Sequence, residues 1–328
     1  MSIGESPKKK PAKPAKAVGK AKAPAGKTTP GVEAKNKDKK ILIDRVDLEW
    51  IAPSCHCPQI LMNAAGPFTQ AVIQHRENAG ENKAKKKKQP RDTMASYIDA
   101  MHVAVGKYHP DWLPYNIYGF PSVAWAKAMA TLSHRLGKTQ YAIDILQFIF
   151  VHGCYRGLIP LFNQPVDLTH PLITPADVLK EVPAAKRKGV IENNADWDKA
   201  LLKVLKAQPD IYARPTMQQD ITYVGGGSSR KAMMAYRARF DDVYFCLPIQ
   251  HWVERLDRSA VVNLVHAVGQ MMGVGAWRLE RHGIHGGFHI VGDIKTIDIA
   301  SDPLETMQAR FTPDTKYLLD AAKKSVGG

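Results

Sequence analysis

The positive charge of this chain is concentrated in two segments that cannot contribute to a hydrophobic core. Residues 1–40 contain 12 Lys against only Glu5, Glu33 and Asp38, which gives a net charge of +9. Residues 83–91 add six positive charges and no negative charge. Because the whole chain carries +15, the rest of the sequence is close to neutral. A folded domain must therefore form outside these two segments.

Residues 1–40 form a Lys/Pro/Ala-rich tail that we expect to be disordered. Prolines interrupt helices, and repulsion between the lysines extends the chain. Two interpretations are open. The tail is a solubilising leader, or it is an arm that resembles the Pro-Ala-Lys tails of histone H1-like proteins, which bind DNA without reading its sequence.

The segregation of charge predicts a polyanionic partner, because evenly spread charge would indicate only solubility. Four cysteines in 328 residues do not make a disulfide framework. No apolar run reaches the roughly 18–20 residues that span a bilayer, and the N-terminus lacks the apolar core of a secretory signal. We therefore expect a cytoplasmic protein, in the host cytoplasm if a phage encodes it, with no membrane partner.

Residues 41–300 carry the patterns of a folded domain. Residues 46–50 alternate apolar and acidic side chains, as in a half-buried strand. A polar insertion at 74–93 carries the second lysine run, and a helix is predicted after it, with Ser122 as N-cap and Gly137 as its end. Residues 143–151 are largely apolar and fit a strand or a short helix. We favour a strand, paired with residues 158–162 across the turn at 153–157.

Residues 164–230 read as a less regular insertion, with a short amphipathic helix near 197–206 and a flexible linker at 225–229. Alternation at 234–240 and 243–249, with Asp241 and Asp242 between, predicts a β-hairpin. A helix at 259–272, a loop at 273–287 and a strand at 288–291 follow, and 301–328 is a C-terminal extension. This order of elements predicts an α+β fold with a ferredoxin-like (RRM-like) core and large insertions.

The loop at residues 273–287 is the most informative segment. Its five glycines permit positive φ angles and let the backbone approach a ligand closely. Arg278 and Arg281 can pair with phosphates, and Trp277 and Phe288 can stack on bases. Histidines 282, 285 and 289 add hydrogen-bonding groups. Such a loop suits a sugar–phosphate backbone, although glycines that serve only local geometry would give the same pattern.

Residues 232–288 resemble the RAMP superfamily of RNA-binding CRISPR proteins, especially its Cas7-like backbone subunits. Those proteins place a G-rich loop between the second helix and the fourth strand of a ferredoxin-like unit. The loop sequence Gly-Val-Gly-Ala-Trp-Arg at 273–278, followed by Gly-Gly-Phe at 286–288, is similar to such loops. The wider layout, with residues 118–121 before the first helix and Arg214-Pro215 before the hairpin, is similar to phage proteins of this type. The resemblance implies a protomer that packs head to tail along a single strand, with the lysine-rich insertion as a thumb over it.

We therefore expect a non-catalytic protein that binds backbone phosphates of single-stranded RNA or DNA and self-associates along the strand. The expected contact residues are basic, aromatic, histidine and glycine positions of the lysine run, the hairpin and the loop: Lys85, Lys86, Lys87, Lys88, Arg91, Arg237, Arg239, Gly273, Gly275, Trp277, Arg278, Arg281, His282, Gly286 and Gly287. Two alternatives are open: a RAMP-type endoribonuclease that uses His56, His282 or His285, and a structural protein of a phage particle whose tail contacts DNA.

Other chemistries find little support in the sequence. Cys55, His56 and Cys57 are adjacent and cannot easily converge on one tetrahedral ion, and no CxxC pair completes a zinc site. The sequence has no phosphate-binding loop of the G-x-x-x-x-G-K-[ST] type. Asp241 and Asp242 fall at the predicted hairpin turn and do not form the carboxylate cluster of a two-metal nuclease. We expect no metal, no cofactor and no catalytic residue.

Overall fold

A computed structural model describes residues 48–62, 92–137, 139–155, 157–167, 170, 172–190, 192, 194–208, 210–224, 231–297 and 320. The chain divides into two compact units, Met1–Asp44 and Arg45–Gly328, and all described residues belong to the second. The predicted basic tail, the lysine run at 83–91 and most of the C-terminal extension lie outside the described residues.

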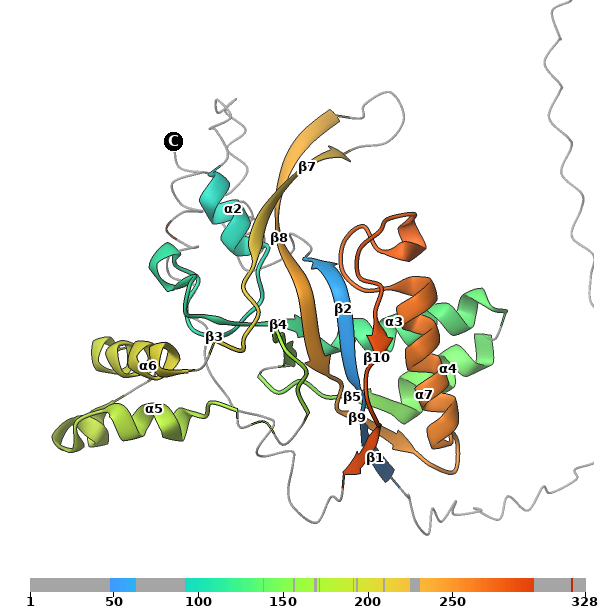
Figure 1. Cartoon of the computed structure of the whole chain (residues 1–328), viewed down its shortest axis with the longest axis horizontal. Coiled ribbons are helices and arrows are strands. Elements are labelled where there is room, and N and C mark those ends of the chain that lie inside the picture. The colour runs from blue at the N-terminus through green and yellow to red at the C-terminus, as the bar shows by residue number, and fades with distance from the viewer. Residues whose placement is uncertain are drawn as a thin grey trace, which may run out of the picture. The chain divides into compact units, whose positions relative to one another are not determined.

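The largest sheet has the strand order β10-β2-β8-β7, and every neighbouring pair in it is antiparallel. Strand β8 has 16 residues, so it pairs with β2 along one edge and with β7 along the other. Together β7 and β8 form a long twisted ribbon that extends beyond the rest of the sheet (Figure 1). The four strands are β2 (Ser54–Leu61), β7 (Thr216–Val224), β8 (Lys231–Cys246) and β10 (His289–Ile290).

Two smaller sheets adjoin the first, with strand orders β11-β1-β9-β5 and β3-β4-β6. Strand β1 leads into β2 across Pro53, and β8 leads into β9 across Leu247 and Pro248. The two four-stranded sheets are therefore joined by chain segments that bend at these prolines, which lack a backbone donor. The remaining strands are β1 (Leu48–Ala52), β3 (Val103–Val105), β4 (Ile117–Pro121), β5 (Ile149–Val151), β6 (Leu158–Pro160), β9 (Ile249–Trp252) and β11 (Lys295–Ile297).

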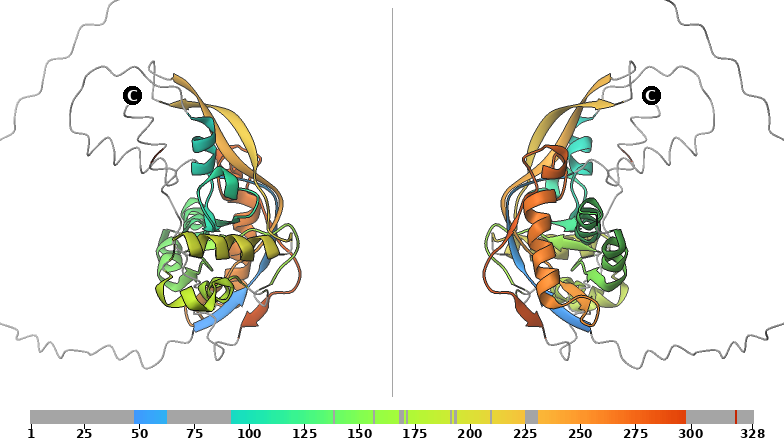
Figure 2. Two further views of the ribbon diagram at one scale, coloured as in Figure 1. Left: turned by 90° about the vertical axis from the view of Figure 1, so that its left-hand side faces the viewer. Right: turned by 90° about the vertical axis from the view of Figure 1, so that its right-hand side faces the viewer.

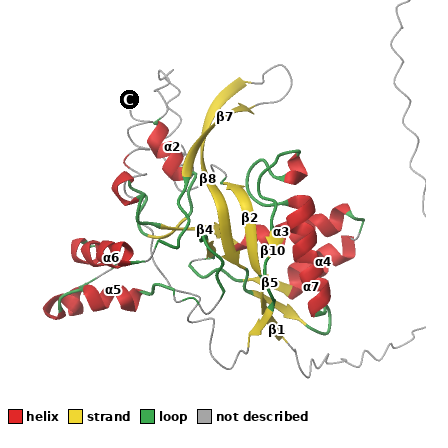
Figure 3. Cartoon of the chain, in the orientation of Figure 1, coloured by secondary structure: helices red, strands yellow, loops and turns green. Residues whose placement is uncertain are grey.

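Two helices on one side of the main sheet complete the principal core. Helix α3 (Ser122–Arg135) buries Trp125 and Met129, and the Trp125 ring lies 4.6 Å from that of Phe245 on β8. Helix α7 (Arg258–Ala267) continues as a π-helical turn, η4 (Val268–Met272), and buries Val261 and Val265 against the same cluster. Figure 3 shows these helices beside β2 and β10. Burial of such large apolar side chains contributes about 1.5–3 kcal/mol each.

A second, smaller core lies around two amphipathic helices, α5 (Pro175–Glu181) and α6 (Ala195–Ala207). They pack side by side in both views (Figures 1 and 2). Thr174 caps α5 in a reciprocal capping box with Asp177. An ion pair of 2.5 Å between Lys107 and Asp198 joins this helical layer to the segment that follows β3.

The other described helices are short or lie at the edge of the main core. Helix α2 packs against β8, and the Tyr97 hydroxyl donates to the Pro215 carbonyl oxygen over 3.1 Å. None of the helices in the described part of the chain is long and apolar enough to cross a bilayer. These helices are α2 (Thr93–Asp99), α4 (Thr139–Phe148), η1 (Pro110–Trp112), η2 (Ala184–Gly189) and η5 (Leu279–Arg281).

The α+β class and three of the predicted helices are confirmed. Helices α3, α6 and α7 with η4 lie where periodicity placed them, and Gly137 ends α3 with a φ of +74°. The sequence predicted Ser122 at the N-cap position. In the structure Ser122 is the first residue of α3, and Pro121 occupies the N-cap position. The predicted strand at residues 46–50 is represented by β1, of which residues from Leu48 onward are described.

One strand prediction is wrong over most of its length, and one strand pairing is wrong. Residues 139–148 are helix α4, in which Ile145 is buried while Ile143 and Leu146 are exposed, and only Ile149–Val151 is a strand. Residues 158–160 form strand β6 as predicted, but β6 pairs with β4 and β5 pairs with β9, so residues 158–162 are not the partner of 143–151. A largely apolar run fits a strand and a helix equally well, and only the tertiary contacts decide between them.

The predicted hairpin turn at Asp241 and Asp242 is also wrong. Asp242 has a φ of +53°, but the chain does not reverse there, and β8 keeps one register with β2 on both sides of it. The hairpin is instead β7–β8, so residues 225–229 join two paired strands, although they lie outside the described residues. The alternation of side chains correctly predicted extended structure in β8 but assigned the wrong hairpin partner to it.

Candidate functional site

The glycine-rich loop at 273–287 is docked along the edge of β2. Strand β10 pairs with Cys55 and His56 at one end of β2. Beyond it, the loop supplies the donors: Gly286 N–H donates to Gln59 O and Ala276 N–H to Leu61 O, each over 2.7 Å. The loop thus satisfies backbone carbonyls that β10 is too short to reach.

Four of the loop's glycines approach protein backbone. Gly273, Gly275 and Gly286 have φ angles of +65°, +86° and +75°. A Cβ on Gly275 would lie 2.5 Å from Leu61 O, and one on Gly286 would overlap the Val274 carbonyl oxygen. A Cβ on Gly283 would likewise overlap Trp277 O. At these positions the local-geometry explanation of the glycines applies, because their free space is filled by the protein itself.

The tip of the loop, by contrast, faces solvent. Trp277 is 50% exposed and has a φ of +51°, and Ile284 is 82% exposed. Arg281 and His282 are also exposed, and His282 has a left-handed φ of +58°. We call these four residues the loop tip. An exposed indole and an exposed guanidinium on one short loop offer stacking and phosphate pairing.

Glu280 fixes the loop tip to helix α3. Its side chain is only 3% exposed and accepts from Arg278 Nε over 2.6 Å and from Arg135 of α3. Gly283 N–H and His285 N–H close the loop by donating to Arg278 O and Trp277 O. Arg278 is therefore engaged within the loop, while Arg281 projects from its exposed tip.

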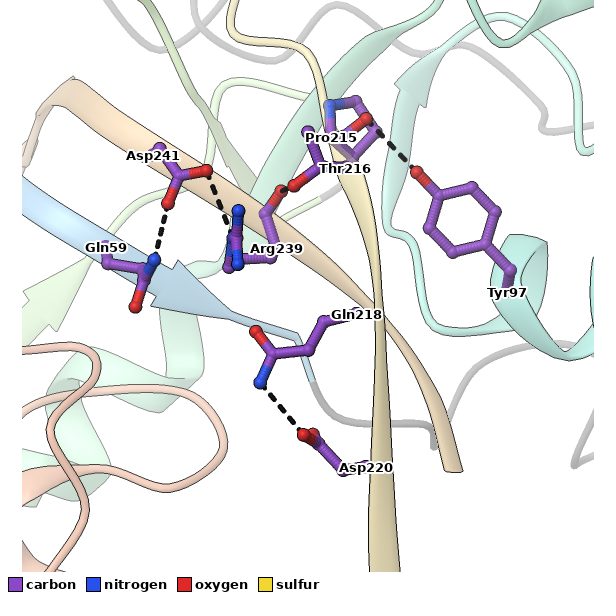
Figure 4. Close-up of polar contacts among 8 residues, drawn as sticks. All are labelled: Gln59, Tyr97, Pro215, Thr216, Gln218, Asp220, Arg239 and Asp241. Atoms are coloured by element: carbon purple, nitrogen blue, oxygen red, sulfur yellow. Dashed lines mark hydrogen bonds and ion pairs between the residues drawn. The ribbon is translucent and has the colours of Figure 1, made fainter. Parts of the chain in front are cut away.

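The two arginines of β8 lie next to the loop and are balanced by carboxylates. Arg237 Nε lies 3.4 Å from Asp220 of β7, and Arg239 Nε lies 3.1 Å from Asp241. Figure 4 shows Asp241 between Arg239 and Gln59, whose amide donates to it over 2.5 Å, and Asp220 beside Gln218. The charge of Arg237 and Arg239 is thus largely neutralised within the sheet.

His285 joins the loop to this polar group. It is 8% exposed, and its burial lowers the pKa of its ring below the usual value; Arg239 lowers it further, while Asp220 and Asp241 partly offset the shift. The loop residues named from the sequence, and Arg237 and Arg239, therefore lie in one neighbourhood. Lys85–Lys88 and Arg91 lie outside the described residues. Phe288, which we expected to stack on bases, is buried against Trp125 and Phe245.

The adjacent residues Cys55, His56 and Cys57 separate onto opposite faces of β2. Both cysteines are buried in the principal core, and burial raises the pKa of Cys57 to about 12. His56 faces the other way and lies 3.0 Å from Asp242. Among the described residues, no group of three or more His, Cys, Asp or Glu side chains is arranged to hold a metal ion.

Sequence reasoning missed a row of rings across the main sheet. Tyr244 of β8 and His289 of β10 flank His56 of β2, with ring centroids 4.6 and 5.0 Å from its own. A cavity of about 780 Å³ opens beside Tyr244. The alternation of side chains around His56 is visible in the sequence. The strand register that brings Tyr244 and His289 beside His56 is not.

No protein-family model matches this chain, and no curated protein sequence matches it significantly.

Proposed function

We propose that this protein binds single-stranded nucleic acid without cleaving it, through the loop tip and the two lysine-rich segments. The observation that carries this proposal is the exposure of Trp277 and Arg281 on a loop whose body is docked to β2 and pinned by Glu280. A rigid exposed ring loses little entropy when a base stacks on it. The loop tip is therefore suited to a flexible single strand.

The binding energy divides between stacking and charge. Stacking of a base on Trp277 contributes about 1–3 kcal/mol and tolerates every base, since each has an aromatic face. Arg281 and the lysines of residues 1–40 and 83–91 pair with phosphates, so this part of the affinity falls as salt rises. Neither contribution reads the sequence of the strand.

The fold supports a further part of the proposal, a ferredoxin-like core of the RAMP, Cas7-like kind. The antiparallel order β10-β2-β8-β7 places the first and third strands of a strand-helix-strand-strand-helix-strand unit at the centre. In that unit α3 follows β2, α7 follows β8, and the glycine-rich loop lies between α7 and β10. Head-to-tail self-association along the strand belongs to the same proposal.

Substitution of the loop tip tests the proposed function. Trp277→Ala and Arg281→Ala, in the full chain, should each weaken binding of a fluorescein-labelled single-stranded oligonucleotide. Loss of one stacked base corresponds to a roughly 5- to 150-fold rise in Kd. Fluorescence anisotropy at fixed salt measures it. Phe150→Ala and Arg255→Ala are matched controls. Phe150 is 44% exposed on β5, and Arg255 lies just before the first residue of α7, whereas the loop follows the last turn of that helical segment.

Equal affinities for the wild type and both loop-tip variants would contradict the role of the loop. Absence of binding by the wild type would contradict the function itself. Shortening of labelled RNA that is lost in His56→Ala would favour the endoribonuclease alternative, since His56 and Asp242, 3.0 Å apart, form the kind of pair that serves general acid–base catalysis.

A further inference from the structure

Three ring side chains lie at one level across the main sheet and face the same side. His289 of β10 is opposite His56 of β2, and His56 is opposite Tyr244 of β8. Side chains of directly opposed residues share a face of the sheet. The ring centroids of the two neighbouring pairs are 4.6 and 5.0 Å apart, so the three rings form a continuous row. We call this row the platform.

The platform lies on the face turned away from α3 and α7. The next residue of each strand, Cys55, Phe245 and Ile290, packs in the core that those helices cover. Because side chains alternate along a strand, the platform faces the opposite side. His289 is exposed, and His56 and Tyr244 are partly exposed, so the row is accessible from solvent.

A cavity of about 780 Å³ extends the platform at Tyr244. Its far wall is the segment after β6, and that wall is anchored at two points. Phe162 and Tyr244 exchange backbone hydrogen bonds of 2.8 and 2.9 Å. Ser54 Oγ donates to the Val166 carbonyl oxygen over 2.9 Å. The cavity is therefore built from fixed elements, and its volume falls in the range of small-ligand sites.

The polar groups of the cavity favour a donor-bearing ring over a phosphate. Asp167, Asp293 and Gln164 line it together with His170, and its described lining includes neither lysine nor arginine. Carboxylates repel phosphate but accept hydrogen bonds from the exocyclic amine of a base such as cytosine. Uracil carries no exocyclic amine.

We propose that the platform and its cavity bind a base of single-stranded nucleic acid, with preference for bases that carry an exocyclic amine. The base stacks on the ring of Tyr244 or His56 and donates to Asp167 or Asp293. This inference rests on the proposed function for its ligand class and adds a second, base-selecting site to the phosphate contacts. It uses none of the loop-tip residues.

Free nucleosides test the site without the rest of the strand. Millimolar cytidine should shift the ring carbon-bound proton resonances of His56 and His289 in a saturable way, while uridine should shift them much less. His56→Gln and His289→Gln assign the two resonances. Tyr244→Leu, which removes the aromatic ring but keeps a branched apolar side chain at this partly buried position, should abolish the cytidine shifts. Tyr236→Leu is the matched control, since Tyr236 is a partly buried ring on the same strand, away from the platform.

Oligonucleotides add a quantitative arm. Tyr244→Leu should raise the Kd of an oligocytidine by roughly 5- to 150-fold. The slope of log Kd against log salt should not change, because no phosphate contact is lost. Oligouridine should bind the variant and the wild type with similar affinity.

The inference is overturned if cytidine leaves both histidine resonances unmoved, or if cytidine and uridine shift them equally. The same holds if Tyr236→Leu and Tyr244→Leu have the same effect. Cytidine shifts without any oligonucleotide binding would support the base site and contradict the proposed function. Oligonucleotide binding that depends on the loop tip, without cytidine shifts, would support the proposed function and contradict the base site.

Discussion

His102 is a half-buried titratable residue between α2 and β3. Its backbone carbonyl accepts from Gly119 N–H over 3.0 Å, and its ring lies 6.4 Å from that of Phe120. Loss of water around the ring lowers the pKa of His102 to about 4. Since the cause is burial, the neutral imidazole is the form that the fold accommodates.

This pKa predicts a loss of stability in mild acid. The unfolded chain takes up a proton at His102 near pH 6.5, whereas the folded chain stays neutral until about pH 4. The stability contributed by neutral His102 is therefore fully present above pH 6.5 and declines as the pH falls toward 4. The decline is on the order of 3 kcal/mol. Urea unfolding at pH 7 and pH 4.5 measures it.

His102→Gln should reduce that pH dependence, because glutamine takes up no proton in either state. Burial lowers the pKa values of His152, His170 and His285 in the same direction, so part of the dependence should persist. A variant with the same acid sensitivity as the wild type would show that His102 is not a source of it.

At the scale of elements, the docking of the glycine-rich loop on β2 gives the next prediction. Gly286 and Gly137 have nearly the same φ, +75° and +74°, but only Gly286 has its Cβ position filled, by the Val274 carbonyl oxygen. Alanine at either position incurs the backbone penalty of about 1–2 kcal/mol. Gly286→Ala must also displace backbone, so its total cost should exceed about 3 kcal/mol. Chemical denaturation of both variants measures the difference.

Equal destabilisation by Gly286→Ala and Gly137→Ala would mean that the loop is not held against β2. The same pair of variants separates loop geometry from ligand contact, because neither glycine belongs to the exposed loop tip. Reduced nucleic-acid binding by Gly286→Ala at a temperature where the protein is folded would indicate that docking positions Trp277 and Arg281.

Helices were easier to predict from this sequence than strand partners. Helix α6 has Asn194 as N-cap and buries Trp197, Leu201 and Val204 at a spacing of three to four residues. The local sequence is therefore enough to predict this helix. Residues 143–151 have only Asp144 and Gln147 as polar residues, and the exposure of Ile143 and Leu146 in α4 depends on how the helix lies against α3. Local pattern cannot supply that arrangement.

The length of β8 shows the same limit. Asp241 and Asp242 are typical turn residues, yet β8 continues through them because β2 pairs on both sides. Asp241 accepts a hydrogen bond from Gln59, and Asp242 pairs with His56, and only the sheet register brings these residues together. The prediction of a strand was correct, and the prediction of its turn was not.

Across the whole molecule, the candidate site was predictable only where its residues are close in sequence. The loop tip lies within eight residues of chain, from Trp277 to Ile284, and the composition of this segment was enough to indicate a candidate site. The platform joins His56, Tyr244 and His289 through two strand registers, and no local pattern relates these positions. The sequence therefore indicated the loop as a candidate site and did not indicate the row formed by His56, Tyr244 and His289.

The segregation of charge gives the last prediction, which concerns the full chain. Residues 1–40 and 83–91 carry the whole +15, so these two segments should supply most of the salt dependence of nucleic-acid binding. A triple change, Lys85→Gln, Lys86→Gln and Lys87→Gln, should then reduce the slope of log affinity against log salt by about 2, the value for three phosphate contacts on a single strand.

The matched control removes the same charge from helix α6, where Lys199, Lys203 and Lys206 are exposed. Changing these three to Gln alters the net charge equally, so a general electrostatic field would affect both triple variants alike. Local contact at residues 85–87 predicts a smaller slope for the first variant alone. Equal slopes in the two variants would mean that the lysine run acts only through net charge, and the thumb-like role of the insertion would be lost.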